Sequence, residues 1–363
     1  MTIPPPDPII HTRESLERII AFLLHSSEQP GVTDVSLRQN GRAVVRANTF
    51  LKAIPQPWLT NDWIGITALL GNPPWLEKPP RLRALRATVD LAGHRFRCTW
   101  GQTRSGETVD VRPIPRHIKT PEELKLPDIL PETLASLSGG LVLFVGPTGA
   151  GKSWTMASLI RHRARIRGGK YVLIENPVEF LHEDTDKAEF YQMEVGKDVE
   201  SYSAALEDVM AQNPDVLVVQ ELVDRRSAEN TLSAALSGHL VMATMHSQEA
   251  ASVPSRFAGL LEPEDEGAYK AALYKLSVCL EMIVVMRLMP GHNGLVPVFE
   301  VLTMRDRPGG QRINKLVTLV AKGDAVGLRN EILMGGSRAG MITMENSLQG
   351  RIDEGLLSLR RTN

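Results

Sequence analysis

The segment that most constrains this chain runs Gly146-Pro147-Thr148-Gly149-Ala150-Gly151-Lys152-Ser153 and matches the pattern G-x-x-x-x-G-K-[ST]. An apolar run, Leu141–Val145, precedes it, and a helical pattern over Lys152–Arg167 follows it. Glycines let the backbone curl so that consecutive N–H groups point at phosphate oxygens, and the helix adds its positive end. The sequence therefore predicts a nucleotide-binding strand, loop and helix, with Lys152 reaching the β- and γ-phosphates and Ser153 holding Mg²⁺. Trp154, directly after Ser153, is included among the expected nucleotide contacts.

Short apolar runs alternate with helical patterns in the C-terminal two thirds of the chain. The runs Tyr171–Ile174, Val216–Val219 and Leu240–Thr244 read as strands, and Tyr202–Gln212 and Ser227–Leu236 read as helices. This alternation predicts an α/β domain with a parallel sheet covered on both faces. From about residue 310 the chain reads as mostly helical.

Acidic side chains follow two of these strands. Val216–Val219 leads into Gln220-Glu221, and a carboxylate at that edge of a parallel sheet faces the same crevice as the phosphate loop. We expect Glu221 either to complete the Mg²⁺ shell or to orient the attacking water. Tyr171–Ile174 leads into Glu175-Asn176-Pro177-Val178-Glu179, whose two carboxylates either include a general base or cap a loop.

Two histidines flank the strand Leu240–Ala243: His239 precedes it, and His246 follows it after Thr244. Imidazole groups at a nucleotide site can sense the γ-phosphate through hydrogen bonds. A structural role for each histidine is the alternative.

The N-terminal third has a different pattern of expected helices and strands. Residues 1–112 combine an amphipathic helical pattern over 13–26 with strand patterns at Val32–Arg38, Arg42–Ala47, Thr88–Leu91, Arg95–Trp100 and Thr108–Arg112, which predicts a small α+β domain. Five prolines then crowd residues 113–131, where they predict a linker. Residues 132–363 form the expected nucleotide-binding domain.

The composition of the chain disfavours several classes of protein. The 363 residues carry 41 basic and 42 acidic side chains, so the formal charge is -1, and we expect no direct nucleic-acid binding. The two cysteines supply neither a four-cysteine zinc site nor a disulfide framework. No apolar run approaches the roughly 18 residues of a membrane span, and the N-terminus lacks signal-peptide features, so we expect a soluble protein without a transmembrane segment.

Four segments taken together resemble the ATPases of the secretion superfamily, which drive type II and type IV secretion, conjugation and type IV pili. The family's Walker A loop, Asp box, Walker B strand and His box correspond to Gly146–Ser153, Ile174–Glu179, Pro214–Glu221 and Gly238–His246. Further similarity lies at 31–37, 112–115 and 340–348. Asn176 and Gln220 depart from the family, which has Asp and Gly there. The likeness indicates a PilT-like or DotB-like member.

The resemblance implies a PAS-like N-terminal domain followed by a RecA-like P-loop ATPase domain with a C-terminal helical extension at about 310–363. It implies a homohexamer that binds ATP and Mg²⁺ between the two domains. It also implies a cytoplasmic protein, peripheral at the inner membrane, which powers membrane-embedded secretion or pilus platform proteins. The implied catalytic residues are Glu179 as base, Glu221 for Mg²⁺ or water, His239 and His246 as γ-phosphate sensors, and Arg104 and Arg112 as arginines contributed by the N-terminal domain.

Two other functions remain open at this point. One is a RecA-like nucleic-acid-dependent ATPase, which the near-neutral charge disfavours. The other is a non-hydrolysing, nucleotide-gated assembly protein, which Asn176 and Gln220 suggest.

Overall fold

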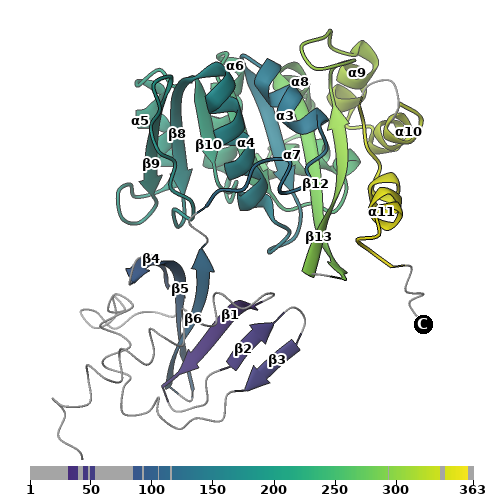
Figure 1. The fold of residues 1–363 in the computed structure, drawn as a ribbon. Coiled ribbons are helices and arrows are strands. Elements are labelled where there is room, and N and C mark those ends of the chain that lie inside the picture. Colours follow the sequence, from purple (N-terminus) through teal and green to yellow (C-terminus); the bar gives the residue numbers. More distant parts are fainter. Residues whose placement is uncertain are drawn as a thin grey trace, which may run out of the picture. The chain divides into compact units, whose positions relative to one another are not determined.

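The computed structural model describes residues 32–39, 44–47, 50–53, 85–91, 94–104, 106–114, 117–292, 294–335 and 340–358. The chain divides into two compact units, Met1–His117 and Ile118–Asn363 (Figure 1). The helix expected over 13–26 and the turn at Asn40-Gly41 lie outside the described residues.

Within the described part of the first unit, six strands form an antiparallel sheet in the order β3-β2-β1-β6-β5-β4. Alternate residues of the two longest strands, such as Phe96, Cys98 and Trp100, are buried, as the period-two pattern requires. The strands are β1 (Val32–Arg38), β2 (Val44–Ala47), β3 (Phe50–Ala53), β4 (Leu85–Leu91), β5 (His94–Thr103) and β6 (Gly106–Ile114).

The second unit contains a larger sheet, whose described strands are ordered β13-β12-β7-β11-β10-β8-β9. Neighbouring strands run parallel from β12 to β9, and the β12–β13 pair is antiparallel. The strands are β7 (Gly140–Val145), β8 (Gly169–Glu175), β9 (Ala188–Glu194), β10 (Val216–Val219), β11 (Leu240–Met245), β12 (Leu280–Gly291) and β13 (Gly294–Thr303). The sequence pattern predicted the central strands but not β9 or the β12–β13 hairpin.

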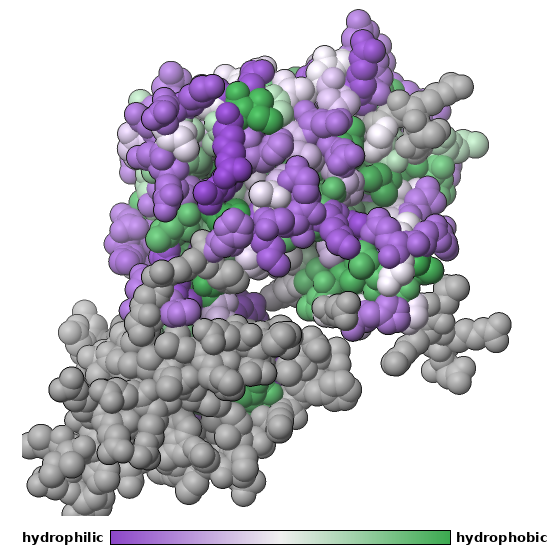
Figure 2. Space-filling model, viewed as in Figure 1, coloured by the Kyte–Doolittle hydropathy of each residue, from purple (hydrophilic) through white to green (hydrophobic). Residues whose placement is uncertain are grey.

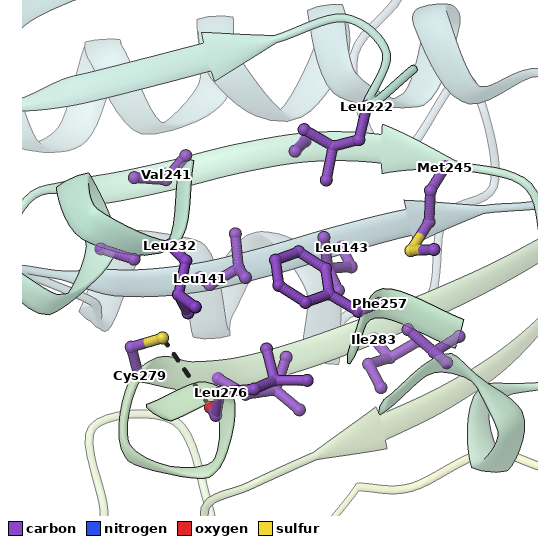
Figure 3. Close-up of a cluster of buried hydrophobic side chains, with 14 of the residues drawn as sticks. Leu141, Leu143, Leu222, Leu232, Val241, Met245, Phe257, Leu276, Cys279 and Ile283 are labelled. Atoms are coloured by element: carbon purple, nitrogen blue, oxygen red, sulfur yellow. Dashed lines mark hydrogen bonds between the residues drawn. The ribbon is translucent and has the colours of Figure 1, made fainter. Parts of the chain in front are cut away.

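Helices cover both faces of this sheet (Figure 1). Leu141 and Leu143 of β7 pack into one buried cluster and Val142 and Phe144 into another, which explains why the strand is apolar at every position. Figure 3 shows the first cluster, in which Phe257 lies beside Leu143 and Ile283. The helices are α3 (Ile129–Ser136), α4 (Lys152–Arg167), α5 (Tyr202–Met210), α6 (Arg225–Leu236), α7 (Val253–Leu260), α8 (Glu266–Cys279), α9 (Asn314–Lys322), α10 (Ala325–Gly335) and α11 (Met344–Asp353), with a 3₁₀ turn, η2, at Ala250–Ser252.

The proline-rich segment that follows the first sheet is short in the structure. Pro113 and Ile114 still belong to β6, and α3 already begins at Ile129. Beyond residue 310 the described chain forms α9, α10 and α11. Over the described ranges, no helix has both the length and the apolar character needed to cross a membrane.

Candidate nucleotide-binding and catalytic site

The phosphate loop lies between the carboxyl end of β7 and the first turn of α4. Gly146, Gly149 and Gly151 have φ values of 151°, 79° and 92°, in the region that favours glycine. A Cβ atom on Gly146 would lie 2.5 Å from the carbonyl oxygen of Met286, so this position also has no room for a side chain. The sequence pattern therefore produces a curled backbone whose N–H groups, with those of the α4 N-terminus, can surround an anion.

Lys152 folds back over this loop. Its Nζ donates hydrogen bonds to the carbonyl oxygens of Gly146 at 2.8 Å and Pro147 at 3.0 Å. Burial lowers the pKa of Lys152, and the charge of Glu221 opposes that shift. The half-buried ammonium group is thus held at the loop, within electrostatic reach of the Glu221 carboxylate. Ser153, the next residue, is also half-buried in the first turn of α4.

His246 joins the loop to the end of β10. Its Nε2 lies 2.9 Å from Oε1 of Glu221, and its Nδ1 lies 3.1 Å from the carbonyl oxygen of Gly146. Both partners are acceptors, so each ring nitrogen must carry a proton for both hydrogen bonds to form. The strands β7, β11 and β10 are parallel neighbours, and their carboxyl ends therefore bring Gly146, His246 and Glu221 together.

The loop that carries Glu179 is fastened to the same edge. The side-chain amide of Gln220 accepts a hydrogen bond from the backbone N–H of Asn176 and donates one to the carbonyl oxygen of Pro177 at 3.3 Å. Glu175 is buried and accepts a hydrogen bond from Gln192 at 2.9 Å, whereas Glu179 is half-buried. Of the two carboxylates expected after the strand Tyr171–Ile174, Glu175 is the last residue of β8 and supports the loop, and Glu179 is the one with partial access to solvent.

His239 lies elsewhere. It immediately precedes β11, where its Nδ1 is 2.8 Å from the carbonyl oxygen of Pro214, and its own carbonyl accepts a bond from Gly140 at 3.0 Å. The six residues of β11 lie between it and His246, so the two histidines are about 23 Å apart. Because one strand cannot present both of its ends to one edge of a sheet, the structure does not bring His239 to the phosphate loop.

The two arginines named from the sequence belong to the first unit. Arg112 is paired with Asp34, whose Oδ1 lies 2.8 Å from Nε and 2.6 Å from Nη2. Arg104 is exposed at the turn between β5 and β6. Their proposed part in catalysis stays a prediction.

A cavity of about 530 Å³ opens beside the phosphate loop. Its walls come from residues 119 and 123–126, residues 150–151 and 154–155, residues 286, 288, 292 and 295–297, and residues 355–356. Figure 2 shows apolar surface near the ends of β12, β13 and α11; β12, β13 and the chain that follows α11 contribute to these walls. Within the cavity wall, the Trp154 ring lies 4.7 Å from the Phe180 ring, and Nζ of Lys119 lies 5.6 Å from Trp154. Apart from residues 150–151 of the phosphate loop and Trp154, no sequence pattern singled out these residues.

Comparison with known proteins gives a consistent result. The family model described as type II/IV secretion system protein matches residues 104–298. A twitching motility protein of Neisseria gonorrhoeae is 31% identical over 266 residues, which cover 73% of this chain and 67% of the relative. The type IV pilus retractation ATPase PilT of Pseudomonas aeruginosa is 29% identical over 265 residues, 73% of each chain.

A solved structure extends the likeness to the fold. The crystal structure of the pilus retraction motor PilT with bound ADP matches with a TM-score of 0.77 and 26% identity, covering 94% of each chain. The family model alone spans more than half of the chain, and its matched region contains the phosphate loop, Glu179, Glu221 and His246. The chain therefore belongs to the type II/IV secretion system protein family.

Proposed function

We propose that this chain is an ATPase motor that hydrolyses ATP at residues 146–153 and powers a type IV secretion, conjugation or type IV pilus machine. One observation carries the proposal: the carbonyl of Gly146, the ring of His246 and the carboxylate of Glu221 form one connected set of contacts beside the α4 N-terminus. A loop built to surround phosphate thus lies against a carboxylate and an imidazole that can respond to it. The relative PilT is named an ATPase, which supports ATP hydrolysis as the reaction.

The residues present fit a bound nucleotide with its metal. The curled loop offers backbone N–H groups to phosphates, and a Cβ on Gly149 would meet nothing within 4 Å, so the loop is open on that side. Ser153 and Glu221 offer hydroxyl and carboxylate oxygens, the ligand types that Mg²⁺ prefers. When bound, Mg²⁺ would neutralise charge on the β- and γ-phosphates. The cavity beside Trp154 would take the nucleobase, because it is mostly apolar and adjoins the loop.

Each side chain then has a role in hydrolysis. The ammonium group of Lys152 would exchange its two loop carbonyls for the β- and γ-phosphates. Glu179 would accept the proton of the attacking water, and His246 would donate a hydrogen bond to the γ-phosphate. Once the γ-phosphate has left, His246 would again contact Glu221 as it does in this structure. The His246–Glu221 contact would therefore depend on which nucleotide is bound.

The finer assignments belong to the same proposal. We infer a PAS-like first domain at 1–112, a linker at 113–131 and a RecA-like ATPase domain at 132–363. We also infer a ring of six chains, in which Arg104 or Arg112 completes the charge at a nucleotide. A peripheral position at the inner membrane, against embedded platform proteins, follows from the same family resemblance.

The substitution Lys152→Ala tests the proposal. We expect nucleotide affinity to fall and phosphate release to drop by roughly 10²–10³-fold, because the main counter-charge of the loop is lost. Lys170→Ala is the matched control, since Lys170 is the second residue of β8, at the end of the strand away from Glu175 and the catalytic loop, and its Nζ bonds the carbonyl of Gln212. Isothermal titration with ADP and a phosphate-release assay measure both effects.

Unchanged turnover in Lys152→Ala would overturn the proposal. Binding of ATP to the wild-type chain without phosphate release would instead favour the non-hydrolysing assembly protein. Strong stimulation by single-stranded DNA would favour the nucleic-acid-dependent ATPase.

A further inference from the structure

Arg351, in the last turn of α11, is a nearly buried arginine that touches three separate segments of the second unit. The residue is 8% exposed. Its Nε donates to the carbonyl oxygen of Pro297 at 3.1 Å, and its Nη2 donates to the carbonyl oxygen of Lys125. Its Nη1 lies 2.9 Å from Oε2 of Glu354, which compensates the buried charge. Every nitrogen of the guanidinium group therefore has a partner.

The three partners lie in the walls of the cavity beside the phosphate loop or next to them. Lys125 and Pro297 line it directly, and Glu354 precedes Gly355 and Leu356, which also line it. The carbonyl of Leu356 in turn accepts a hydrogen bond from the backbone of His292, another lining residue, at 3.2 Å. One side chain thus fastens the segment 119–126, the β12–β13 hairpin and the chain after α11 to each other.

One of these walls is not part of a helix or strand. Residues 121–125 form turns closed by local backbone hydrogen bonds, and Lys125 adopts a φ of 52°, a left-handed conformation that is uncommon outside glycine. Segments of this kind open locally at low free-energy cost unless tertiary contacts hold them. A planar guanidinium group spreads five N–H donors over three nitrogen atoms in a fixed fork and so reaches partners in different directions, whereas an ammonium group has its three N–H donors on one atom.

We propose that Arg351 is a positioning residue that pre-organises the nucleobase cavity. The inference rests on the proposed function, in which the phosphate loop binds the triphosphate and the cavity takes the base. Arg351 touches neither, so it acts by keeping the cavity walls in the bound arrangement before the nucleotide arrives, which reduces the ordering cost of binding. The C-terminal helix α11 thereby sets affinity for the base while the phosphate loop sets affinity for the phosphates.

Arg351→Lys tests this division, with ADP and inorganic tripolyphosphate as the two probes. We expect the dissociation constant for ADP to rise about tenfold and that for tripolyphosphate, which has no base, to stay within about twofold. Arg163→Lys is the matched control. Arg163 is also nearly buried and also donates from three nitrogens, but its partners Leu134, Leu137 and Tyr171 do not line the cavity. We expect this control to leave both dissociation constants within about twofold.

A second measurement uses the unmodified chain and applies even if the variant does not fold. Because the walls are already held in the bound arrangement, hydrogen exchange at residues 119–126 and 354–357 should be slow before any ligand is added. Fast exchange at these residues in the ligand-free chain would overturn the inference. So would an Arg351→Lys protein that binds ADP as the wild type does, or one that loses affinity for both probes equally.

Other outcomes would contradict the proposed function and not the role of Arg351 alone. If the wild-type chain binds neither probe, the proposed nucleotide site itself is wrong. If it binds both equally and Trp154→Ala changes nothing, the cavity is not the base site. If Trp154→Ala weakens the binding of ADP alone but Arg351→Lys does not, only the proposed role of Arg351 is wrong.

Discussion

Arg163 shows how far a single residue can depart from what its neighbourhood in the sequence indicates. It belongs to a run of alternating arginines, 161, 163, 165 and 167, which reads as a solvated face or a subunit contact. Positions two apart on a helix point in nearly opposite directions, so the four cannot share one face. The structure buries Arg163, where it bonds the carbonyls of Leu134 and Leu137 at 3.1 Å and the hydroxyl of Tyr171 at 2.8 Å. It thereby fastens α3 and β8 to the helix that begins at the phosphate loop.

His182 is a second residue to which the sequence assigned no role. Its ring stacks on Phe190 with centroids 5.0 Å apart, and among the described residues its enclosed Nδ1 has no hydrogen-bond partner. Burial, with a smaller contribution from the charge of Arg161, lowers the pKa of His182 to about 4. The folded chain therefore binds fewer protons at this site than the unfolded chain between pH 6.5 and 4.

This difference predicts a pH-dependent stability. The free energy of unfolding should fall as pH drops through the window from 6.5 to 4, with a contribution from His182 of up to about 1.4 kcal/mol per pH unit. His182→Phe keeps a ring against Phe190 but cannot titrate, so its stability should depend less steeply on pH. Urea unfolding of both proteins across this range measures the effect. Parallel curves for the two would contradict the prediction.

At the scale of elements, the two departures from the family pattern prove to be in contact. Gln220 follows β10 and Asn176 follows β8, and the Gln220 amide bonds the backbone on both sides of the Asn176–Pro177 peptide. A glycine at position 220 has no side chain to make these bonds. In this chain the loop that carries Glu179 is thus held to the segment after β10 that carries Glu221, which is compatible with the proposed hydrolysis.

Two glycines, Gly146 in the loop between β7 and α4 and Gly350 in α11, give a prediction at the scale of elements. Gly146→Ala places a Cβ 2.5 Å from the backbone oxygen of Met286 at a φ of 151°. We expect this variant to lose roughly 1–3 kcal/mol of stability and to bind ADP more weakly, because the loop must shift. Gly350→Ala on α11 is the control: its Cβ would meet nothing within 4 Å, and alanine should add about 0.5–1 kcal/mol as the better helix former.

Thermal unfolding and ADP titration of both variants check the pair. The prediction fails if Gly146→Ala matches the wild type in both measurements. It also fails if the two alanines have effects of the same sign on stability.

At the scale of the whole molecule, the two units each have a sheet and a core of their own. The proposed motor requires ATP hydrolysis in the second unit to change how that unit acts with the first. It also requires several chains to act together. A rigid body with its own core can move as a unit when a shared ligand changes, which is how domain closure operates in other proteins.

We therefore expect ATP and Mg²⁺ to assemble the chain into rings of six. Sedimentation velocity should show a species of about six times the mass of one chain, and negative-stain images should show six-fold rings. Lys152→Ala should assemble less readily if nucleotide binding drives the assembly. A protein that remains monomeric at high concentration with ATP would contradict the motor.

The sequence by itself determined the strand, loop and helix around residues 146–153, the strands on either side, and the placement of Glu221 after β10. These features depend on local periodicity and on glycine conformations, which neighbouring residues encode. Only the tertiary structure buried Glu175 and Arg163 and formed the cavity beside Trp154. The bond from Arg351 to Lys125 joins residues 226 positions apart, and contacts at such separation leave no periodic trace in the chain because they form only once the whole sheet is packed.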